Sequence, residues 1–361
     1  MKVLYDHQIF SSQVYGGVSK YFAEIINILQ NRCDIDISAW ISNNQYAKEY
    51  NLFKMTGFLN GSNFRGKGLL MEKIGIPYSL YKIRRGDYDL FHATSYDDYC
   101  LSGLGSKPLV ITYHDVNFLT ERDYSAKQVR LQRKYIERAD HIIAISENTK
   151  KDLLQYFDYP EDKITVAYHG VPQISIPSCL STRIVPYNYI LYVGMRHGYK
   201  NFINFVKAFS LISEEYPDIR VICTRNSFSK DECDLLINLG VSDRFVAMPV
   251  DETALSRLYR DALFFIYPSI YEGFGMPILE AMQQGCPNVL ANASCFPEIA
   301  KDAAAYFDPY DIDSISDAMK KVISDNNYRS NIIAAGYKRV LDFSWEKSAN
   351  IHWDVYRSLV E

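Results

Sequence analysis

The chain has 361 residues, of which 48% are hydrophobic, and 39 Lys and Arg against 43 Asp and Glu leave a formal net charge of −4. This length exceeds what a single hydrophobic core usually supports, so two domains are expected, and the slight net acidity argues against a dedicated nucleic-acid binder. The seven cysteines form no Cys-x-x-Cys pair and no apolar run is as long as a membrane span, so we expect a cytoplasmic protein without structural zinc.

The chain opens with a predicted strand, a glycine turn and a helix. Residues 2–5 are the strand, and Gly16 and Gly17 precede a helix predicted over residues 18–30. Two adjacent glycines before a helix allow a phosphate or a sugar to approach the backbone N–H groups at the positive end of the helix dipole. A plain tight turn is the alternative interpretation.

A second strand is predicted over residues 35–42, and residues 54–85 are expected to be irregular and basic. This basic stretch carries seven Lys and Arg side chains against Glu72 alone. Such an excess favours an anionic membrane surface or a phosphate-bearing acceptor, and an ordinary solvated face is the alternative.

Three apolar strands with polar carboxyl ends follow, over residues 88–92, 108–115 and 140–147. Ligands of open parallel sheets bind outside the carboxyl ends of the strands, which makes His114, next to an aspartate, a candidate site residue. His92 has a similar local setting, and a structural role is its alternative.

The N-terminal domain is expected to span residues 1–172. Helices over residues 122–138 and 148–157 and a strand over 163–168 complete its alternation of strands and helices, which predicts a parallel sheet. Prolines and serines then mark residues 173–187 as a linker.

The same alternation begins again in a C-terminal domain over residues 188–344, so the fold class is α/β. Two sheet-and-helix halves of this kind imply a cleft between them. Strands are predicted at residues 189–193, 219–223, 244–248, 263–267 and 287–291, and helices at 201–214, 230–239, 252–260, 312–323, 327–342 and 345–360.

The loop over residues 194–201 follows the first strand of this second half and carries Arg196 and Lys200. A guanidinium and an ammonium at the carboxyl end of a strand suit a diphosphate, because both offset the charge that develops as the diphosphate leaves. Two solvated loop cations are the alternative.

A second glycine loop joins the strand over 263–267 to a helix that starts near Pro277. Amides at a helix start suit phosphate, and carboxylates suit hydroxyl groups, so one ligand could combine a ribose, a diphosphate and a hexose. A sugar nucleotide has these three parts. The residues concerned are Glu272, Gly273, Phe274, Gly275 and Glu280.

These motifs together resemble retaining glycosyltransferases of family 4. Glu272 and Glu280 resemble the Glu-x7-Glu signature of that family, and Arg196 with Lys200 resembles its diphosphate site. Gly16-Gly17 is similar to its N-terminal glycine loop, and His114 to its histidine at the domain cleft. The likeness runs through the whole chain in the right order.

The resemblance implies the GT-B architecture, in which two Rossmann-like domains face each other across a cleft. It implies that the second domain holds the nucleotide, that the first holds the acceptor, and that the last helix, about 345–361, crosses back to the N-terminal domain. The activity it implies is transfer of a hexosyl group from a nucleotide-diphosphate sugar to an acceptor hydroxyl, with retention of the anomeric configuration.

The resemblance also implies roles for the site residues, none of which is a covalent nucleophile. Arg196 and Lys200 would hold the leaving diphosphate, and Glu272 with the amides of Gly273 and Gly275 would orient the sugar. Glu280 would bind the ribose. His114 would bond the primary hydroxyl of the sugar or shape the reacting centre.

The loop that carries Lys200 resembles those of mannosyltransferases of surface-polysaccharide assembly, so GDP-mannose is the favoured donor. UDP-N-acetylglucosamine and other UDP- or dTDP-sugars are the alternatives. The basic stretch suggests an oligosaccharide acceptor with a lipid-diphosphate link and a peripheral contact with the inner membrane face, and a soluble acceptor is the alternative.

No cofactor and no metal ion are expected, because Arg196 and Lys200 already supply positive charge for a diphosphate. Two other function classes compete: a nucleotide-sugar epimerase or hydrolase of the same architecture, and a non-catalytic sugar-binding protein. Three Asp-x-Asp strings lie at predicted element boundaries, at residues 34–36, 87–89 and 311–313.

Overall fold

A computed structural model describes residues 1–40, 42–52, 67–115, 126–171 and 182–361, and the side chains of 67–72 are not part of the description. The chain forms two compact units. Unit 1 comprises residues 1–170 and 344–361, and unit 2 comprises residues 171–343.

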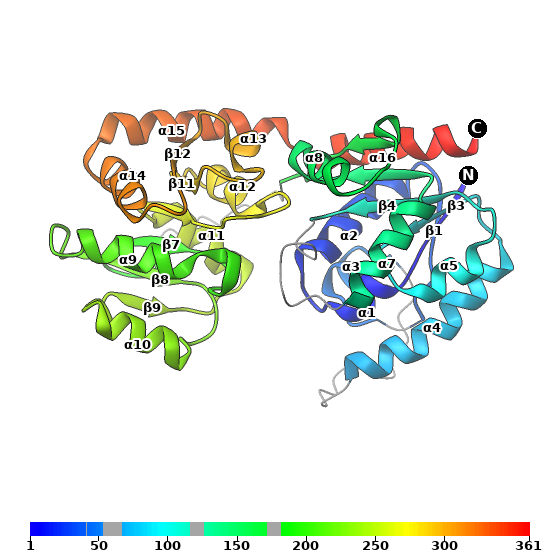
Figure 1. Cartoon of the computed structure of the whole chain (residues 1–361), viewed down its shortest axis with the longest axis horizontal. Coiled ribbons are helices and arrows are strands. Elements are labelled where there is room, and N and C mark those ends of the chain that lie inside the picture. The colour runs from blue at the N-terminus through cyan, green and yellow to red at the C-terminus, as the bar shows by residue number, and fades with distance from the viewer. Residues whose placement is uncertain (41, 53–66, 116–125, 172–181) are drawn as a thin grey trace. The chain divides into compact units, whose positions relative to one another are not determined.

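Unit 1 is built on a six-stranded parallel sheet with the strand order β2-β1-β3-β4-β5-β6, of which Figure 1 labels β1, β3 and β4. Its central strands β3 and β4 are buried along their whole length, as expected when helices cover both faces of a parallel sheet. The strands are β1 (Lys2–Tyr5), β2 (Asp34–Ile37), β3 (Leu90–Ala93), β4 (Leu109–Tyr113), β5 (His141–Ala144) and β6 (Ile164–Val166).

The helices of unit 1 come from both ends of the chain. The last helix, α16, packs on α2 and β3, which confirms the predicted return of this helix to the N-terminal half (Figure 1). The helices are α1 (Gln8–Ser12), α2 (Gly17–Leu29), α3 (Gln45–Glu49), α4 (Lys67–Arg85), α5 (Asp98–Leu104), α7 (Ala126–Arg138), α8 (Glu147–Tyr156) and α16 (Trp345–Val360), with a 3-10 turn η2 (Glu161–Lys163).

The expectation of an irregular stretch over 54–85 is wrong for its second part, which forms α4; residues 53–66 lie outside the described residues. Gly75 and Pro77 both oppose a helix. Tertiary packing overrides them, since Ser79 and Ile83 are buried, and a Cβ at Gly75 would lie 2.5 Å from the His7 ring. The glycine therefore allows α4 to pack closely on the segment of α1.

Unit 2 contains a second six-stranded parallel sheet, with the order β12-β11-β10-β7-β8-β9. Counted from β7 as the first strand, this is the doubly wound order 3-2-1-4-5-6 read from the opposite edge. The strands are β7 (Asn188–Tyr192), β8 (Ile219–Cys223), β9 (Phe245–Ala247), β10 (Phe264–Tyr267), β11 (Asn288–Ala291) and β12 (Ala304–Phe307).

The helices of unit 2 follow its strands as crossovers. The short helix α13 and strand β12 are additions to the predicted elements. The helices are α9 (Phe202–Ile212), α10 (Lys230–Asn238), α11 (Glu252–Asp261), α12 (Met276–Gln283), α13 (Phe296–Ala300), α14 (Ile312–Ser324) and α15 (Asn326–Arg339), with 3-10 turns η4 (Gly198–Lys200) and η5 (Val340–Asp342).

The predicted α/β class with two Rossmann-like domains is therefore confirmed. In unit 2 the chain direction across the sheet reverses between β7 and β10, which are hydrogen-bonded neighbours. Loops that follow two such strands diverge to opposite faces of the sheet and leave a crevice at its carboxyl edge. None of the described helices has the length and apolarity needed to span a membrane.

Candidate functional site

The loops after β7 and β10 meet at the carboxyl edge of the unit 2 sheet. The backbone N–H of Ile270 donates to the carbonyl of Tyr199 at 2.8 Å. Tyr199 lies in the loop predicted to hold a diphosphate, and Ile270 comes two residues before Glu272. The switch point of the sheet thus brings the two predicted motifs together, although 72 residues separate Lys200 from Glu272.

Lys200 and Glu272 form an ion pair, with 2.5 Å between Nζ and Oε1 and 14% of each side chain exposed. The Lys200 Nζ also lies 4.9 Å from the Tyr199 ring centre and 5.7 Å from that of Tyr267, so aromatic faces flank the ammonium. The cation assigned to the diphosphate and the carboxylate assigned to the sugar are therefore paired with each other.

Ser294 clamps the backbone of Glu272. Its Oγ accepts from the Glu272 N–H at 3.1 Å and donates to the Glu272 carbonyl at 2.5 Å. Tyr267 hydrogen-bonds the Glu272 side chain, and burial together with that negative charge raises the pKa of Tyr267 far above its usual value. Tyr267 thus stays protonated and donates to the carboxylate. The motifs did not reveal Ser294 or Tyr267 as site residues.

The glycine loop turns sharply into α12. Gly275 caps the helix in the left-handed region with φ +87, and a Cβ there would lie 3.0 Å from Ile278. Phe274 is buried and meets Phe343 edge-on at 5.9 Å between ring centres. Gly275 therefore serves the turn, and Phe274 anchors the loop to the core of unit 2.

Glu280 has a different environment from Glu272. It lies on α12, and Tyr259 of α11 donates to its Oε2 at 3.3 Å. The two glutamates of the Glu-x7-Glu motif are therefore held by different groups, as expected if they serve different parts of one ligand.

Arg196 is held by Glu232 of α10. Its Nε lies 2.8 Å from Glu232 Oε1, Nη2 donates to the carbonyls of Asn226 and Ser227, and the guanidinium lies 4.8 Å from the Phe228 ring centre. Burial alone would raise the pKa of Glu232, but the hydrogen bonds from Arg196 and the Ser229 backbone lower it.

The Arg196 side chain is 7% exposed, and its Nη1 is buried without a hydrogen-bond partner in the described part of the chain. The two N–H groups of Nη1 are thus unused among the described contacts of the guanidinium. Glu232 was not predicted, although Ser229-x-x-Glu232 has the spacing of a capping box, which the structure contains.

In unit 1, His114 lies just after β4 among aromatic rings. Its ring centre is 5.2 Å from that of Tyr21 and 6.1 Å from that of His169, and burial lowers the pKa of His114 to about 3. Its Nε2 is buried and has no hydrogen-bond partner within the described ranges. His114 is therefore neutral at physiological pH and has one ring nitrogen for a ligand hydroxyl.

His92 instead belongs to a buried hydrogen-bond network that joins α16 to α2, β1, β3 and β4. This is the structural role weighed as its alternative. The network links Tyr5 to Tyr356 (2.6 Å), Tyr356 to His92 Nδ1 (2.5 Å), His92 Nε2 to Thr112 (3.0 Å), Thr112 to Tyr21 (3.3 Å), Tyr21 to His352 Nε2 (2.6 Å), and His352 Nδ1 to the Ser348 carbonyl (2.7 Å).

Gly16 and Gly17 lie at the start of α2. The Gln13 side chain accepts from the Ser19 N–H at 3.1 Å, and a Cβ at Gly16 would lie 2.1 Å from Gln13 Oε1. Gly16 thus gives room to this internal cap, while a Cβ at Gly17 would meet no atom within 4 Å. Gly17 leaves open the approach that a sugar or phosphate would need.

The three Asp-x-Asp strings have structural partners. Asp36 pairs with Lys82, Asp87 pairs with Lys2, and Asp311 caps α14 by accepting from two backbone N–H groups. Among the residues that the structure describes, no three His, Cys, Asp or Glu side chains gather as a metal site would require.

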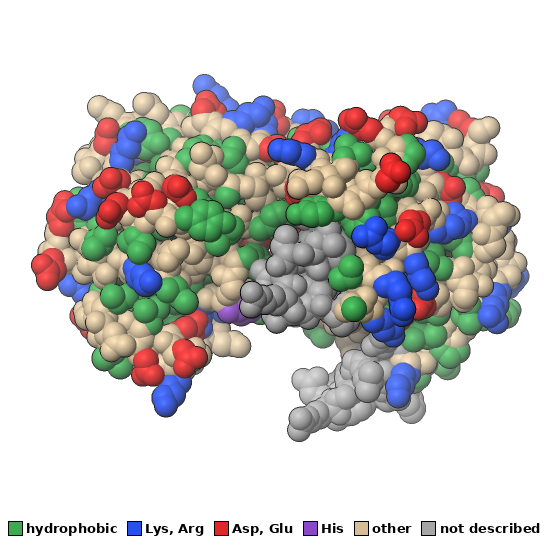
Figure 2. Space-filling view, in the orientation of Figure 1, with side chains coloured by type: hydrophobic (Ala, Val, Ile, Leu, Met, Phe, Trp, Pro, Cys, Tyr) green, Lys and Arg blue, Asp and Glu red, His purple; other side chains and the backbone are tan. Residues whose placement is uncertain are grey.

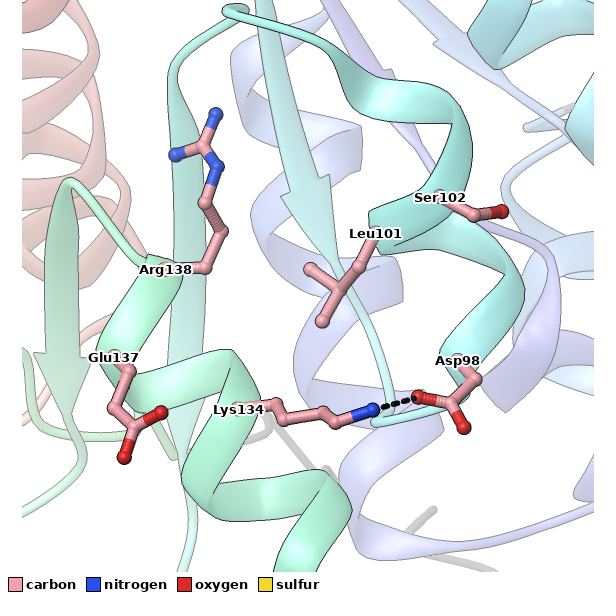
Figure 3. A pocket seen from close by; sticks show the side chains of 6 residues that line it. All are labelled: Asp98, Leu101, Ser102, Lys134, Glu137 and Arg138. Carbon is pink, nitrogen blue, oxygen red and sulfur yellow. Dashed lines mark hydrogen bonds and ion pairs between the residues drawn. The ribbon is translucent and has the colours of Figure 1, made fainter.

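A groove with a volume of about 680 Å³ lies between α5 and α7 of unit 1 (Figure 3). Lys134 crosses it to reach Asp98 at 3.3 Å. No predicted site residue lines it, so it is separate from the loops described above. The lining residues are Asp98, Leu101, Ser102, Lys134, Glu137 and Arg138.

A basic surface covers α7 in the view of Figure 2, where Lys and Arg side chains gather over this helix. Four of its basic side chains are exposed, against the acidic Glu137. This surface is an addition to the predicted basic stretch. The four are Lys127, Arg130, Arg133 and Lys134.

Comparison with known proteins covers both units. Residues 15–173 match the family described as Glycosyltransferase Family 4, and residues 182–339 match that described as Glycosyl transferases group 1. The two matches together span most of the chain.

Individual relatives agree with these matches. The chain is 28% identical to O-antigen chain mannosyltransferase B of Escherichia coli, over 93% of this chain and 91% of that protein. It is 26% identical to O-antigen chain mannosyltransferase RfbU of Salmonella typhimurium strain LT2, over 64% of this chain and 70% of that protein. The Anabaena protein HepE, solved with UDP and glucose, is similar in fold, with a TM-score of 0.75, 18% identity, and coverage of 99% of this chain and 100% of that one.

Proposed function

Because this chain belongs to the glycosyltransferases, with a family 4 match in unit 1 and a group 1 match in unit 2, we propose that it transfers a hexosyl group from a nucleotide-diphosphate sugar to a saccharide acceptor. Mannose is the favoured hexose. The anomeric configuration is retained. The donor binds in unit 2 at the switch point between β7 and β10, and unit 1 binds the acceptor.

The convergence of Lys200 and Glu272 at one edge of the sheet carries this proposal. Lys200 binds the diphosphate, and Glu272 accepts from a sugar hydroxyl. Arg196 directs its unused Nη1 donor at a phosphate oxygen, because charge-assisted bonds of this kind stabilise the leaving diphosphate most when its charge has developed.

Glu280 binds the ribose hydroxyls, and the loop of Gly273, Phe274 and Gly275 follows the diphosphate and hexose. The leaving diphosphate takes the proton of the acceptor hydroxyl on the face from which it departs, so no side chain forms a covalent intermediate. His114, neutral and with a free Nε2 as far as the structure describes its surroundings, donates or accepts one bond at the sugar.

GDP-mannose is the proposed donor. Two relatives named as O-antigen mannosyltransferases support mannose, and their names support an acceptor in surface-polysaccharide assembly. UDP-N-acetylglucosamine is the alternative donor. The acceptor we propose is an oligosaccharide linked to a lipid diphosphate.

The basic surface on α7 would let unit 1 rest on an anionic membrane. Co-sedimentation with vesicles containing phosphatidylglycerol tests this contact, and vesicles of phosphatidylcholine alone are the control. Equal binding to both would contradict a contact that depends on charge.

A thermal-shift panel of nucleoside diphosphates and their sugars tests the donor. A ligand at about 100 times its Kd stabilises by about 2.7 kcal/mol, which should raise the Tm of a unit of this size by roughly 5–10 °C. Transfer is then measured with the selected sugar and a lipid-diphosphate-linked acceptor. A free sugar or an epimer formed without acceptor would instead support the rival enzymes, and no response to any nucleotide would support a non-catalytic protein.

We also propose that transfer needs no divalent metal, because Arg196 and Lys200 offset the diphosphate charge. Transfer in excess EDTA should equal transfer in Mg²⁺. Loss of activity in EDTA that Mg²⁺ restores would disprove metal independence.

A further inference from the structure

We propose that Glu272 holds Lys200 until the donor binds and releases it only to a ligand that has both a diphosphate and a sugar. The site would thereby distinguish a nucleotide sugar from a bare nucleoside diphosphate and would expel the diphosphate product. This inference rests on the proposed function and adds a specificity role for Glu272 and a positioning role for Ser294.

The ion pair is shielded from water well enough to compete with a bound anion. Its atoms are 2.5 Å apart, 14% of each side chain is exposed, and the rings of Tyr199 and Tyr267 flank the ammonium. Water screens such a pair less than it screens a pair on the open surface, so a competing anion must replace a strong partner. A diphosphate therefore has to displace the carboxylate from Lys200.

A bare diphosphate makes this exchange unfavourable. Once its oxygens hold Lys200, Glu272 has lost its cation and lies close to the negative charge of the phosphates. The hexose of a nucleotide sugar offers hydroxyl donors to the same carboxylate. Only a nucleotide sugar then offers phosphate oxygens to Lys200 and hydroxyl groups to Glu272.

Ser294 holds the backbone of Glu272, so the carboxylate cannot move away from the phosphate charge. Its hydroxyl bonds both the N–H and the carbonyl of Glu272, at 3.1 and 2.5 Å, and the Cys295 thiol lies 3.2 Å from the same carbonyl. The backbone of the loop is thus fixed from β11 and α13, so the carboxylate stays near Lys200. Ser294 is a positioning residue in this sense.

The same exchange runs in reverse after transfer. The sugar leaves with the acceptor, and the diphosphate passes to water the proton that it took from the acceptor hydroxyl. It then carries its full negative charge, and Glu272 has no hydroxyl partner. Lys200 then returns to the carboxylate as the nucleotide departs. The ion pair would therefore help release the product.

Titration calorimetry of the full chain tests the exchange with GDP and GDP-mannose, or with UDP and UDP-N-acetylglucosamine if the thermal-shift panel selects uridine. Glu272→Gln should bind the bare diphosphate about tenfold more tightly than the wild type, a change of about 1.4 kcal/mol. The sugar nucleotide should gain less, because it loses a charged partner, so the preference for it should shrink.

Glu214→Gln is the matched control, since it makes the same change of charge at an exposed position of unit 2. It should alter neither affinity. Ser294→Ala should tighten binding of the bare diphosphate in the same direction by about threefold, and it carries the test if Glu272→Gln does not fold. A merely structural loss would weaken binding of both ligands.

The outcomes distinguish a failure of the proposed exchange from a failure of the proposed transferase function. If the wild type binds GDP and transfers mannose but Glu272→Gln and Ser294→Ala bind GDP no more tightly, the exchange is wrong and the proposed function stands. If the wild type binds no nucleotide at all, both are wrong.

Discussion

At the scale of single residues, the structure holds the Arg196 guanidinium in one orientation. Glu232, two loop carbonyls and the Phe228 ring fix the guanidinium plane, and Nη1 is left over. A fixed guanidinium loses little side-chain entropy when it binds a phosphate. If Arg196 contacts the diphosphate as proposed, Glu232 is the residue that positions it.

Arg196→Ala should therefore lower kcat by about 100-fold, the usual effect of removing one group that stabilises developing charge. It should also cost about 1–3 kcal/mol of stability, because Glu232 loses its partner at 19% exposure. Initial rates of sugar transfer and urea unfolding measure the two effects. Arg220→Ala, at an exposed arginine of β8, is the control, and near-normal turnover of Arg196→Ala would exclude it from the site.

Residues that belong to motifs could be predicted from the sequence. The residues that contact them in the folded unit could not. Lys200 and Glu272 lie in loops with recognisable spacing, so each could be proposed. Ser294 and Tyr267 have no such spacing. Their role comes from contacts between β10, β11 and the glycine loop, which exist only once the sheet has formed.

At the scale of elements, the Ser348 carbonyl determines which atom donates and which accepts in the hydrogen-bond network that joins α16 to the rest of unit 1. The Ser348 carbonyl only accepts, so His352 donates to it through Nδ1 and accepts from Tyr21 through Nε2. Tyr21 then accepts from Thr112, and Thr112 accepts from His92 Nε2. This assignment takes both histidines as neutral in the folded unit, because burial lowers the pKa of His352 to about 4 and that of His92 well below its usual value.

Tyr21→Phe removes the hydroxyl in the middle of this network and leaves His352 Nε2 buried without its donor. The expected cost is about 1–3 kcal/mol, the usual penalty for an unsatisfied buried group. Urea unfolding of the two proteins measures it. Tyr310→Phe, at a tyrosine that is 70% exposed, should stay within about 0.5 kcal/mol of the wild type, and an equally small effect of Tyr21→Phe would argue against the network.

Periodicity predicted most of the strands because parallel strands buried on both faces are continuous apolar runs. It did not predict α4, because the glycine and proline that oppose a helix are local signals, whereas the contacts that favour it come from α1 and α5. The short helices α1, α3 and α5 have five to seven residues, too few for a periodic pattern to emerge.

At the scale of the whole molecule, the two units should differ in their response to acid. Six of the seven histidines lie in unit 1. Burial lowers the pKa of His7 and His352 to about 4 and that of His114 to about 3, and it lowers the pKa values of His92 and His169 strongly. Unfolding returns each to about 6.5, so the unfolded state binds more protons below that pH.

The stability of unit 1 should therefore fall as the pH decreases from about 6.5 towards 4, by about 1.4 kcal/mol per pH unit for each histidine. Asp6 has the opposite sign, because burial raises its pKa to about 6 and its folded carboxyl already binds a proton below that value. Burial also lowers the pKa of His141, so one carboxyl opposes six histidines and stability still rises with pH.

Tryptophan fluorescence isolates this effect, since Trp40, Trp345 and Trp353 all lie in unit 1. Its urea midpoint should drop between pH 7.5 and pH 5 by more than the midpoint of far-UV circular dichroism, which reports both units. Identical fluorescence midpoints at the two pH values would refute the prediction.

The position of α16 also sets the order in which the units can form during synthesis. Unit 1 lacks one of its helices until residues 344–361 have been made, whereas unit 2 is complete at residue 343. At about 5–20 residues per second, the ribosome needs roughly 10–35 s to pass from residue 170 to residue 344. During that time Tyr5, Tyr21 and His92 lack their α16 partners. Unit 1, whose first residues are made before unit 2, would therefore complete its fold last.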